Sequence, residues 1–196
     1  MIARRRMVRN YEDRPVEDAA VERIVEAGLK APSAGFSQGQ SLVVVVDEGL
    51  RRQVAALADE DHYTAAGFDP WISRAPVHVV VCTSEDVYRR RYAEADKAGD
   101  AEQHWPVPYW WVDAGATLEN ILLAAVDEGL AAGFLGVHAI DGLKDLLGIP
   151  EEVEPIGIVT LGYPAPDRPS GSLARGRRPG VVHRDRWGGP VGGTDR

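Results

Sequence analysis

The stretch that decides the fold is residues 77–83, VHVVVCT, a nearly unbroken run of apolar and mostly β-branched side chains. Such a run is typical of a strand that is buried on both faces. A second run of this kind, LVVVV, occupies residues 42–46. We therefore predict two central strands, with His78 as a strand residue and the single cysteine, Cys82, as part of the core.

Helices and further strands are predicted around these two runs. Between Val21 and Leu29, apolar residues recur at helical spacing, which predicts a helix over residues 17–30. The same reading gives helices over 49–59, 113–130 and 141–147, and strands over 134–137 and 156–161. The helix over 113–130 has little polar face and is expected to be buried nearly all round. The order of elements shows no internal repeat and favours an α+β fold.

Length and composition indicate a single domain. The chain has 196 residues, of which 44% are hydrophobic and 27% charged, as is typical of a folded globular protein. We expect one domain over residues 1–187 and a frayed tail over 188–196. The segment 94–109, which is polar and then aromatic, is expected to form an ordered loop or a lid over a ligand. After Gly162 the chain becomes rich in Pro, Gly and Arg, which predicts an extended arm.

Arginine is concentrated at the two ends of the chain. The net charge is -8, which argues against general binding to nucleic acid or to an anionic membrane surface. However, residues 1–16 carry five Arg against two acidic residues, and residues 168–187 carry six Arg against one. Two interpretations remain open on charge alone: the ends meet around an anion, or they are solvated tails.

Several classes of site are not supported by the sequence. No secretory signal and no membrane-spanning apolar run is present, so a cytoplasmic protein is expected. The five histidines lack zinc-site spacing, and neither a glycine-rich phosphate loop nor a nucleophile elbow occurs. If the protein is an enzyme, a bound cofactor should therefore carry the chemistry, with no metal site and no catalytic side-chain nucleophile.

Four segments, in the correct order, resemble those of the FMN-dependent nitroreductase family. They are residues 5–11 (RRMVRNY), 31–38 (APSAGFSQ), 113–130, and 162–164 with 175–183. The resemblance implies a three-layer fold with a central mixed sheet flanked by helices and a C-terminal arm that wraps a dimer partner. It also implies an oxidoreductase in which NADH or NADPH delivers a hydride to FMN, and chemistry takes place at N5 of the flavin.

The resemblance also implies the residues that bind the cofactor. The FMN phosphate would be held by Arg5, Arg175 and Arg177, while Arg9 would lie near the ribityl chain and the N1/O2 edge of the flavin. Polar contacts to the ring would come from Ser33, Ser37 and Gln38, and backbone N–H groups around Leu135 and Gly136 would approach N5. The complete set is Arg5, Arg6, Arg9, Pro32, Ser33, Ser37, Gln38, Leu135, Gly136, Arg175 and Arg177.

Two departures from the family pattern concern the contacts to the flavin and the substrate pocket. Met7 stands where a serine is usual, and Phe36 stands where an asparagine is common. The second substrate is open between a nitroaromatic, a quinone, a free flavin and an activated alkene. An alternative from another class is a non-catalytic flavin-sequestering or regulatory protein of the same fold.

Assembly as a homodimer is expected for two reasons. Residues 163–187 contain too many Pro and Gly residues for a long helix and too few apolar residues for a core of their own. Val181 and Val182, with Trp187 close behind, are short apolar anchors that could add to a neighbour's sheet. The resemblance places FMN at the subunit interface, where the 33–38 loop of one chain meets the arginines of the other.

Overall fold

The computed structural model describes residues 1–97, 105–167, 171–176 and 178–189. The strands are β1 (Gln40–Val45), β2 (Val77–Thr83), β3 (Ala131–Gly136) and β4 (Glu154–Gly162). The α-helices are α1 (Asp18–Leu29), α2 (Glu48–Leu57), α3 (Glu60–Ala65), α4 (Trp71–Arg74), α5 (Glu85–Tyr92), α6 (Tyr109–Asp127) and α7 (Leu143–Leu147). Short 3-10 helices are η1 (Ile2–Arg4), η2 (Ala34–Phe36), η3 (Ala95–Lys97), η4 (Val137–Ala139) and η5 (Gly171–Arg175).

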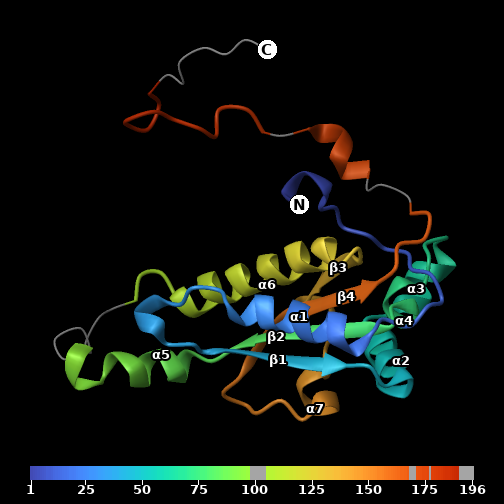
Figure 1. Ribbon diagram of the computed structural model, residues 1–196, viewed down its shortest axis with the longest axis horizontal. Helices are drawn as coiled ribbons and strands as arrows, with labels where there is room; N and C mark the ends of the chain where they lie inside the picture. The colour runs from blue at the N-terminus through green and yellow to red at the C-terminus, as the bar shows by residue number, and fades with distance from the viewer. Residues whose placement is uncertain (98–104, 168–170, 177, 190–196) are drawn as a thin grey trace.

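The four strands form one antiparallel sheet in the order β1-β2-β4-β3 (Figure 1). The expectation of a mixed sheet is therefore wrong for the part of the chain that the structure describes. Parallel pairing is limited there to an isolated bridge between Met7 and Ala132. Unbroken apolar runs are typical of parallel strands, but in this chain they arise because helices cover both faces of an antiparallel sheet.

Two apolar layers sandwich the sheet, so the expected α+β fold with three layers is confirmed. Val79 and Val81 of β2 pack in the layer that contains α1 and α6. Val80 and Cys82 point to the opposite face and pack with residues of α2, α4 and α7. Every residue of β2 is buried, and burial raises the pKa of the Cys82 thiol to about 11. Cys82 and His78 are thus core residues, as predicted.

Helix α6 starts earlier and is more exposed than the sequence predicts. It begins at Tyr109, inside the segment that was expected to be a loop or lid. Within the predicted range, Gly115, Glu119 and Asp127 are exposed, so burial nearly all round is wrong for a single chain. Residues 98–104, the centre of the predicted lid, lie outside the described residues.

Three short helices, α3, α4 and α5, were not predicted. Helix α5 has the sequence EDVYRRRY, which lacks an apolar period because only Tyr88 faces the core. The helix is supported instead by the (i, i+4) ion pair between Arg89 and Glu85. Such helices depend on tertiary contacts that a pattern search does not see.

The arm leaves the body of the molecule after β4 (Figure 1). Its regular structure within the described residues is the single turn of η5. The apolar residues of the arm are not buried in this chain: the exposed fraction is 60% for Val181, 65% for Val182 and 88% for Trp187. Of the predicted frayed tail, Gly188 and Gly189 are described, and residues 190–196 lie outside the described part.

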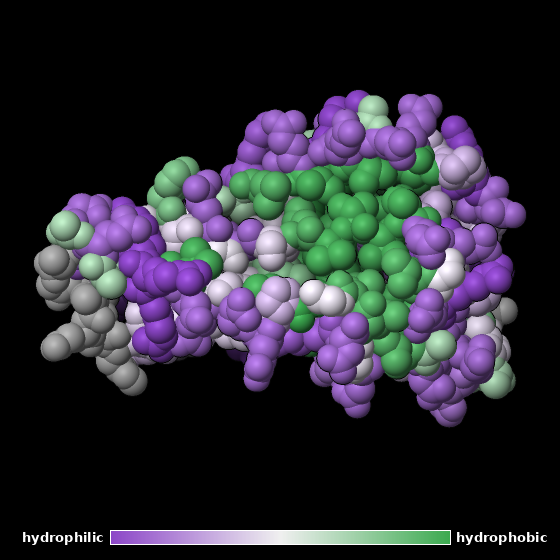
Figure 2. Space-filling model, turned by 90° about the horizontal axis from the view of Figure 1, so that it is seen from below, coloured by the Kyte–Doolittle hydropathy of each residue, from purple (hydrophilic) through white to green (hydrophobic). Residues whose placement is uncertain are grey.

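The β1 side of the molecule carries an apolar surface. β1 is an edge strand of the sheet, and Figure 2 shows extended apolar surface on the side from which β1, α2 and α7 are seen. Exposed apolar side chains at β1 and α2 are Val44 in β1, Val46 just after it and Leu57 in α2. Among the described helices, none has the length and apolar character needed to span a membrane.

Candidate functional site

The N-terminal segment lies against β3, at the edge of the sheet opposite β1. Met7 forms a bridge with Ala132, and the Val8 N–H donates to the Ala132 carbonyl at 3.0 Å. This close approach needs a glycine in β3, because a Cβ on Gly133 would lie 2.6 Å from the Val8 carbonyl oxygen. The segment that carries Arg5, Arg6 and Arg9 is therefore fixed beside this strand.

The three N-terminal arginines have different surroundings. Arg5 is half-buried, and its Nε lies 3.4 Å from the Glu119 carboxylate of α6. Arg6 is exposed. The guanidinium of Arg9 lies 5.8 Å from the centre of the Trp71 ring, while the Arg9 N–H donates to Asp167 at 2.9 Å.

The start of the arm is fastened to the same N-terminal segment. Tyr11 forms a bridge with Pro164, and the Asn10 side chain donates to the Pro166 carbonyl at 2.8 Å. These contacts join residues 10 and 11 to residues 164 and 166, which precede the arginine-rich residues 168–187, so they do not test whether the two groups of arginines meet around an anion. Further along the arm, Arg175 is exposed in η5, and Arg177 lies outside the described residues.

Leu135 and Gly136 occupy the far end of β3 from the Met7 bridge. Both are half-buried, and Gly136 pairs across the sheet with Gly157. A Cβ on Gly136 would lie 2.8 Å from the His138 ring, so the backbone at this point has a close neighbour. N-terminal arginines and the two strand-end residues thus belong to one edge of the sheet.

The Ser33–Gln38 loop lies elsewhere, between α1 and β1, and has an unusual backbone. Gly35, Phe36 and Gln38 all have positive φ, at 62°, 55° and 52°. For residues with a Cβ this conformation is strained, and such strain persists only where neighbours hold it. Within the loop, Ser37 Oγ donates to the Ala34 carbonyl at 2.6 Å, and the Gln38 N–H donates to Ser33 Oγ at 2.9 Å.

These internal bonds change how the predicted loop residues can act. Ser37 is buried and its hydroxyl proton is used inside the loop, whereas Pro32 and the Gln38 side chain are exposed and Ser33 is half-buried. The Ser33 hydroxyl accepts one bond and keeps its proton for another partner. Gln38 and Ser33 are therefore better placed than Ser37 to contact a ligand.

A buried carboxylate holds the loop from the side of α6. Asp113 accepts one hydrogen bond from the Ala34 N–H and one from the Tyr88 hydroxyl, each at 2.8 Å. The amide of Gln40 contacts the same hydroxyl. Burial, together with the neighbouring Asp113 carboxylate, raises the pKa of Tyr88.

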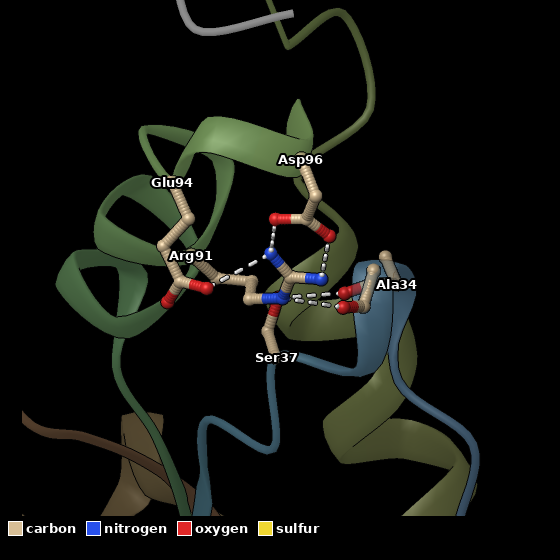
Figure 3. Close-up of polar contacts among 6 residues, drawn as sticks. Ala34, Ser37, Arg91, Glu94 and Asp96 are labelled. Carbon is tan, nitrogen blue, oxygen red and sulfur yellow. Dashed lines mark hydrogen bonds and ion pairs between the residues drawn. The ribbon is translucent and has the colours of Figure 1, made fainter. Parts of the chain in front are cut away.

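An arginine holds the loop from the side of α5. Figure 3 shows Arg91 between the loop and two acidic residues. Its Nε donates to the Gly35 carbonyl at 3.0 Å, and its other nitrogens pair with Asp96 at 2.7 Å and Glu94 at 3.1 Å. The hydrogen bonds to Asp96 raise the pKa of Arg91.

The sequence reasoning missed Tyr88, Arg91 and the role of Asp113. Asp113 was noted only as the first residue of a helix, and Arg91 is one of three consecutive arginines. No signal in a single sequence separates Arg91, which faces the loop, from Arg89, which pairs with Glu85.

The chemistry of the predicted residues fits FMN. Guanidinium groups suit a phosphate, and polar loop groups with strand-end N–H groups suit a flavin ring. The described contacts bring the N-terminal arginines to the β3 edge, but none of them joins these arginines to the Ser33–Gln38 loop. Two open clefts, one beside α7 and one between the N-terminal segment and α2, contain none of the predicted residues.

A metal centre receives no support from the geometry. Across the described ranges, no group of three or more His, Cys, Asp or Glu side chains is placed to hold a metal ion.

Comparison with solved structures identifies the fold. The structure of NfrA1 from B. megaterium matches with a TM-score of 0.73 at 24% identity, covering 95% of this chain and 73% of that one. The hypothetical oxidoreductase YcnD from Bacillus subtilis matches with a TM-score of 0.68 at 26% identity, covering 93% and 71%. The class is thus that of three-layer α+β proteins with the nitroreductase fold.

Sequence comparison gives the family. The model of the nitroreductase family matches residues 2–163, and the chain belongs to this family. A protein of Archaeoglobus fulgidus with the provisional name NADH dehydrogenase/NAD(P)H nitroreductase is 30% identical over 191 residues, covering 95% of this chain and 97% of its own. The FMN reductase [NAD(P)H] of Bacillus subtilis is 31% identical over 168 residues, which is 82% of this chain and 63% of that protein.

Proposed function

We propose that the protein is an FMN-dependent oxidoreductase that uses NADH or NADPH to reduce a small organic acceptor. The observation that carries the proposal is the fixed position of the N-terminal arginine segment along β3. Arg5, the predicted phosphate-binding residue, and the strand end at Leu135 and Gly136 therefore lie along the same edge of the sheet. The family relationship and the names of the relatives support the same activity.

The residues of the chain would bind and orient the cofactor rather than react. Arg5 would bind the phosphate, and it would exchange its contact with the half-exposed Glu119 for a dianion. Arg9 would place positive charge near the ring, which stabilises an anionic reduced form. Backbone N–H groups at Leu135 and Gly136 would approach the reactive edge. The chemistry that bound FMN supplies is the acceptance of a hydride from NAD(P)H and its transfer to the acceptor.

The proposed active form is a homodimer in which the arm of one copy covers the other. Val181, Val182 and Trp187 expose apolar surface that this chain does not bury. β1 has an open edge within the described residues, and apolar side chains surround it. If the partner's arm adds to this edge, it would supply hydrogen-bond partners for β1 and would bury the apolar residues of the arm. In this dimer the Ser33–Gln38 loop of one copy would meet the arginines of the other, as the family resemblance implies.

The test is an absorption spectrum of the purified protein before and after anaerobic addition of NADH or NADPH. We expect a yellow protein whose flavin absorbance is bleached by one of the two nucleotides and restored by a quinone. A colourless protein that does not take up added FMN overturns the proposal. A yellow protein that does not consume NAD(P)H with any acceptor supports a flavin-sequestering role instead.

A further inference from the structure

Helix α4 lies at one end of the sheet together with α2 and α3 (Figure 1). It has four residues, Trp71–Arg74, which is too short for a helix to be stable by itself. The buried carboxylate of Glu60 in α3 accepts hydrogen bonds from the Ile72 N–H at 2.6 Å and from the Ser73 N–H at 3.2 Å. These bonds satisfy N–H groups at the start of α4 that have no partner inside the helix.

Two further side chains hold carbonyl groups of α4 and of the residue after it. His78 of β2 donates from Nε2 to the Ile72 carbonyl at 2.7 Å. Arg51 of α2 donates from Nη1 to the Ser73 carbonyl at 3.2 Å and to the Ala75 carbonyl at 2.6 Å. Polar side chains from three different elements therefore fix the position of α4.

The fixed helix contacts the N-terminal segment through two side chains. The ring of Trp71 is buried and packs on β3, where a Cβ on Gly133 would lie 2.8 Å from it. The guanidinium of Arg9 lies 5.8 Å from the centre of this ring. Arg74 donates from Nη1 to the side-chain oxygen of the buried Asn10. Helix α4 thus holds both the backbone next to Arg9 and the Arg9 side chain.

A tryptophan ring attracts a cation that lies within about 6 Å of its centre. Arg9 is exposed, and an exposed arginine side chain loses entropy when it is held in one orientation. Because the Trp71 ring orders the guanidinium before the cofactor binds, binding itself requires less ordering.

We infer that Trp71 is a positioning residue that holds the Arg9 guanidinium beside bound FMN and thereby raises the reduction potential of the flavin. Positive charge fixed near the ring favours the anionic reduced form over the oxidised form. The inference rests on the proposed function, and it adds a residue that lies outside the segments on which the family resemblance depends.

The first test replaces Trp71 by leucine and measures the midpoint potential of the bound FMN by redox titration. We expect the affinity for reduced FMN relative to oxidised FMN to fall about three- to tenfold, the range of a cation–π contact. A tenfold fall lowers a two-electron potential by about 30 mV. Trp71→Phe keeps an aromatic ring and should retain most of the potential. An unchanged potential in W71L overturns the inference.

The matched control for W71L is Leu143→Ala. Leu143 of α7 is buried in the same apolar layer as Trp71, so its replacement also removes core packing. L143A should lower the free energy of unfolding and leave the flavin potential unchanged. If L143A lowers the potential as much as W71L does, loss of packing is the cause and the inference is wrong.

The second test shows whether Trp71 acts through Arg9. Arg9→Ala should lower the potential at least as much as W71L, and in the double variant R9A/W71L the Trp71 change should add nothing. Additive effects would mean that Trp71 acts on the flavin directly, which contradicts a positioning role. A potential in R9A equal to that of the unmodified protein also overturns the inference.

The same measurements separate this inference from the proposed function. If the unmodified protein does not take up FMN, both fail. If it binds FMN and R9A lowers the potential while W71L does not, only the inference fails. Should W71L not fold, tetrafluorotryptophan at position 71 takes its place, because fluorine atoms weaken the attraction of the ring for a cation with little change in shape. An unchanged potential in that protein likewise overturns the inference.

Discussion

The hydroxyl of Tyr11 lies 2.7 Å from Oγ1 of Thr160, a contact between residues 149 positions apart in the chain. The same hydroxyl lies within hydrogen-bond distance of the Val8 carbonyl, at 3.1 Å. Tyr11 is 1% exposed, and burial raises its pKa. This contact anchors the arginine-bearing segment to β4 in the centre of the domain.

Replacing Tyr11 by phenylalanine should therefore destabilise the protein and loosen the N-terminal segment. The Thr160 hydroxyl would keep its longer contact with the Gly133 carbonyl, at 3.4 Å, so loss of the Tyr11 hydrogen bond costs about 0.5–1.5 kcal/mol. We expect a lower free energy of unfolding in urea and weaker FMN binding. Tyr63→Phe is the control, because Tyr63 is exposed. Equal urea midpoints for Y11F and Y63F would contradict this reading of the contact.

His78 should make stability depend on pH in the mildly acidic range. Its Nε2 donates to the Ile72 carbonyl at 2.7 Å, and its buried Nδ1 has no hydrogen-bond partner among the described residues. Burial lowers the pKa of His78 from 6.5 to about 4. The depressed pKa means that stability is fully present above pH 6.5 and is lost as the pH falls towards 4, by roughly 2 kcal/mol at pH 5.

Urea unfolding at several pH values between 7 and 5 measures this effect. His78→Gln cannot gain a proton, so its stability should be nearly flat over the same range, even if it is lower at pH 7. If the free energy of unfolding of the variant falls with pH as steeply as that of the unmodified protein, groups other than His78 cause the pH dependence.

Charge reversal at Arg5 should weaken the binding of FMN far more than it weakens the fold. In R5E a carboxylate would face the phosphate, and it would also face Glu119, the present partner of Arg5. We expect the Kd for FMN to rise by more than about tenfold, since a charge-assisted hydrogen bond contributes about 1.5–3 kcal/mol. Riboflavin, which has no phosphate, should bind the variant and the unmodified protein equally well.

The matched control for R5E is Arg52→Glu, which reverses an exposed charge on α2 that pairs with Glu48. R52E should retain FMN. The same comparison applies to Arg177→Glu. If neither R5E nor R177E changes FMN affinity, the phosphate binds elsewhere.

Removal of the arm should abolish both dimerisation and retention of FMN. A chain that ends at Pro164 lacks the arm and also the Ala165 to Asp167 contacts with Asn10 and Arg9. A chain that ends at Asp167 keeps those contacts, so it isolates the effect of the arm. Light scattering should give a dimer for the full chain and a monomer for both truncated forms. Active, flavin-bound protein with a mass near the 21.3 kDa of one chain would rule out the shared site.

The layers of the fold could be predicted from the sequence because buried strands and long amphipathic helices leave strong patterns. Residues 77–83 and the helix over 17–30 lie as predicted, at Val77–Thr83 and Asp18–Leu29. Strand direction could not be predicted, because an antiparallel sheet covered on both faces has the same apolar runs as a parallel one. Helix α5 could not be predicted either, since its support comes from ion pairs and one buried tyrosine.

The candidate site was predictable in part. The bridge between Tyr11 and Pro164 brings the N-terminal segment to the start of the arm, but the meeting of the two arginine groups around an anion stays a prediction. The roles of Asp113 and Arg91 depend on which side chains face the loop, and this is decided by packing. The cofactor contacts assigned to the predicted residues remain predictions that the variants above test.

The open edge of β1 also bears on how the protein behaves when it is made. Gln40–Val45 has the sequence QSLVVV, with strong strand propensity and no charged residue or proline to discourage pairing. An edge of this kind can pair with any other exposed strand, including a second β1. In the proposed dimer the arm of the partner would cover this edge, and a chain without that cover is expected to aggregate more readily. Expression yield should therefore fall when the arm is shortened, and a lysine at Val44 should restore it.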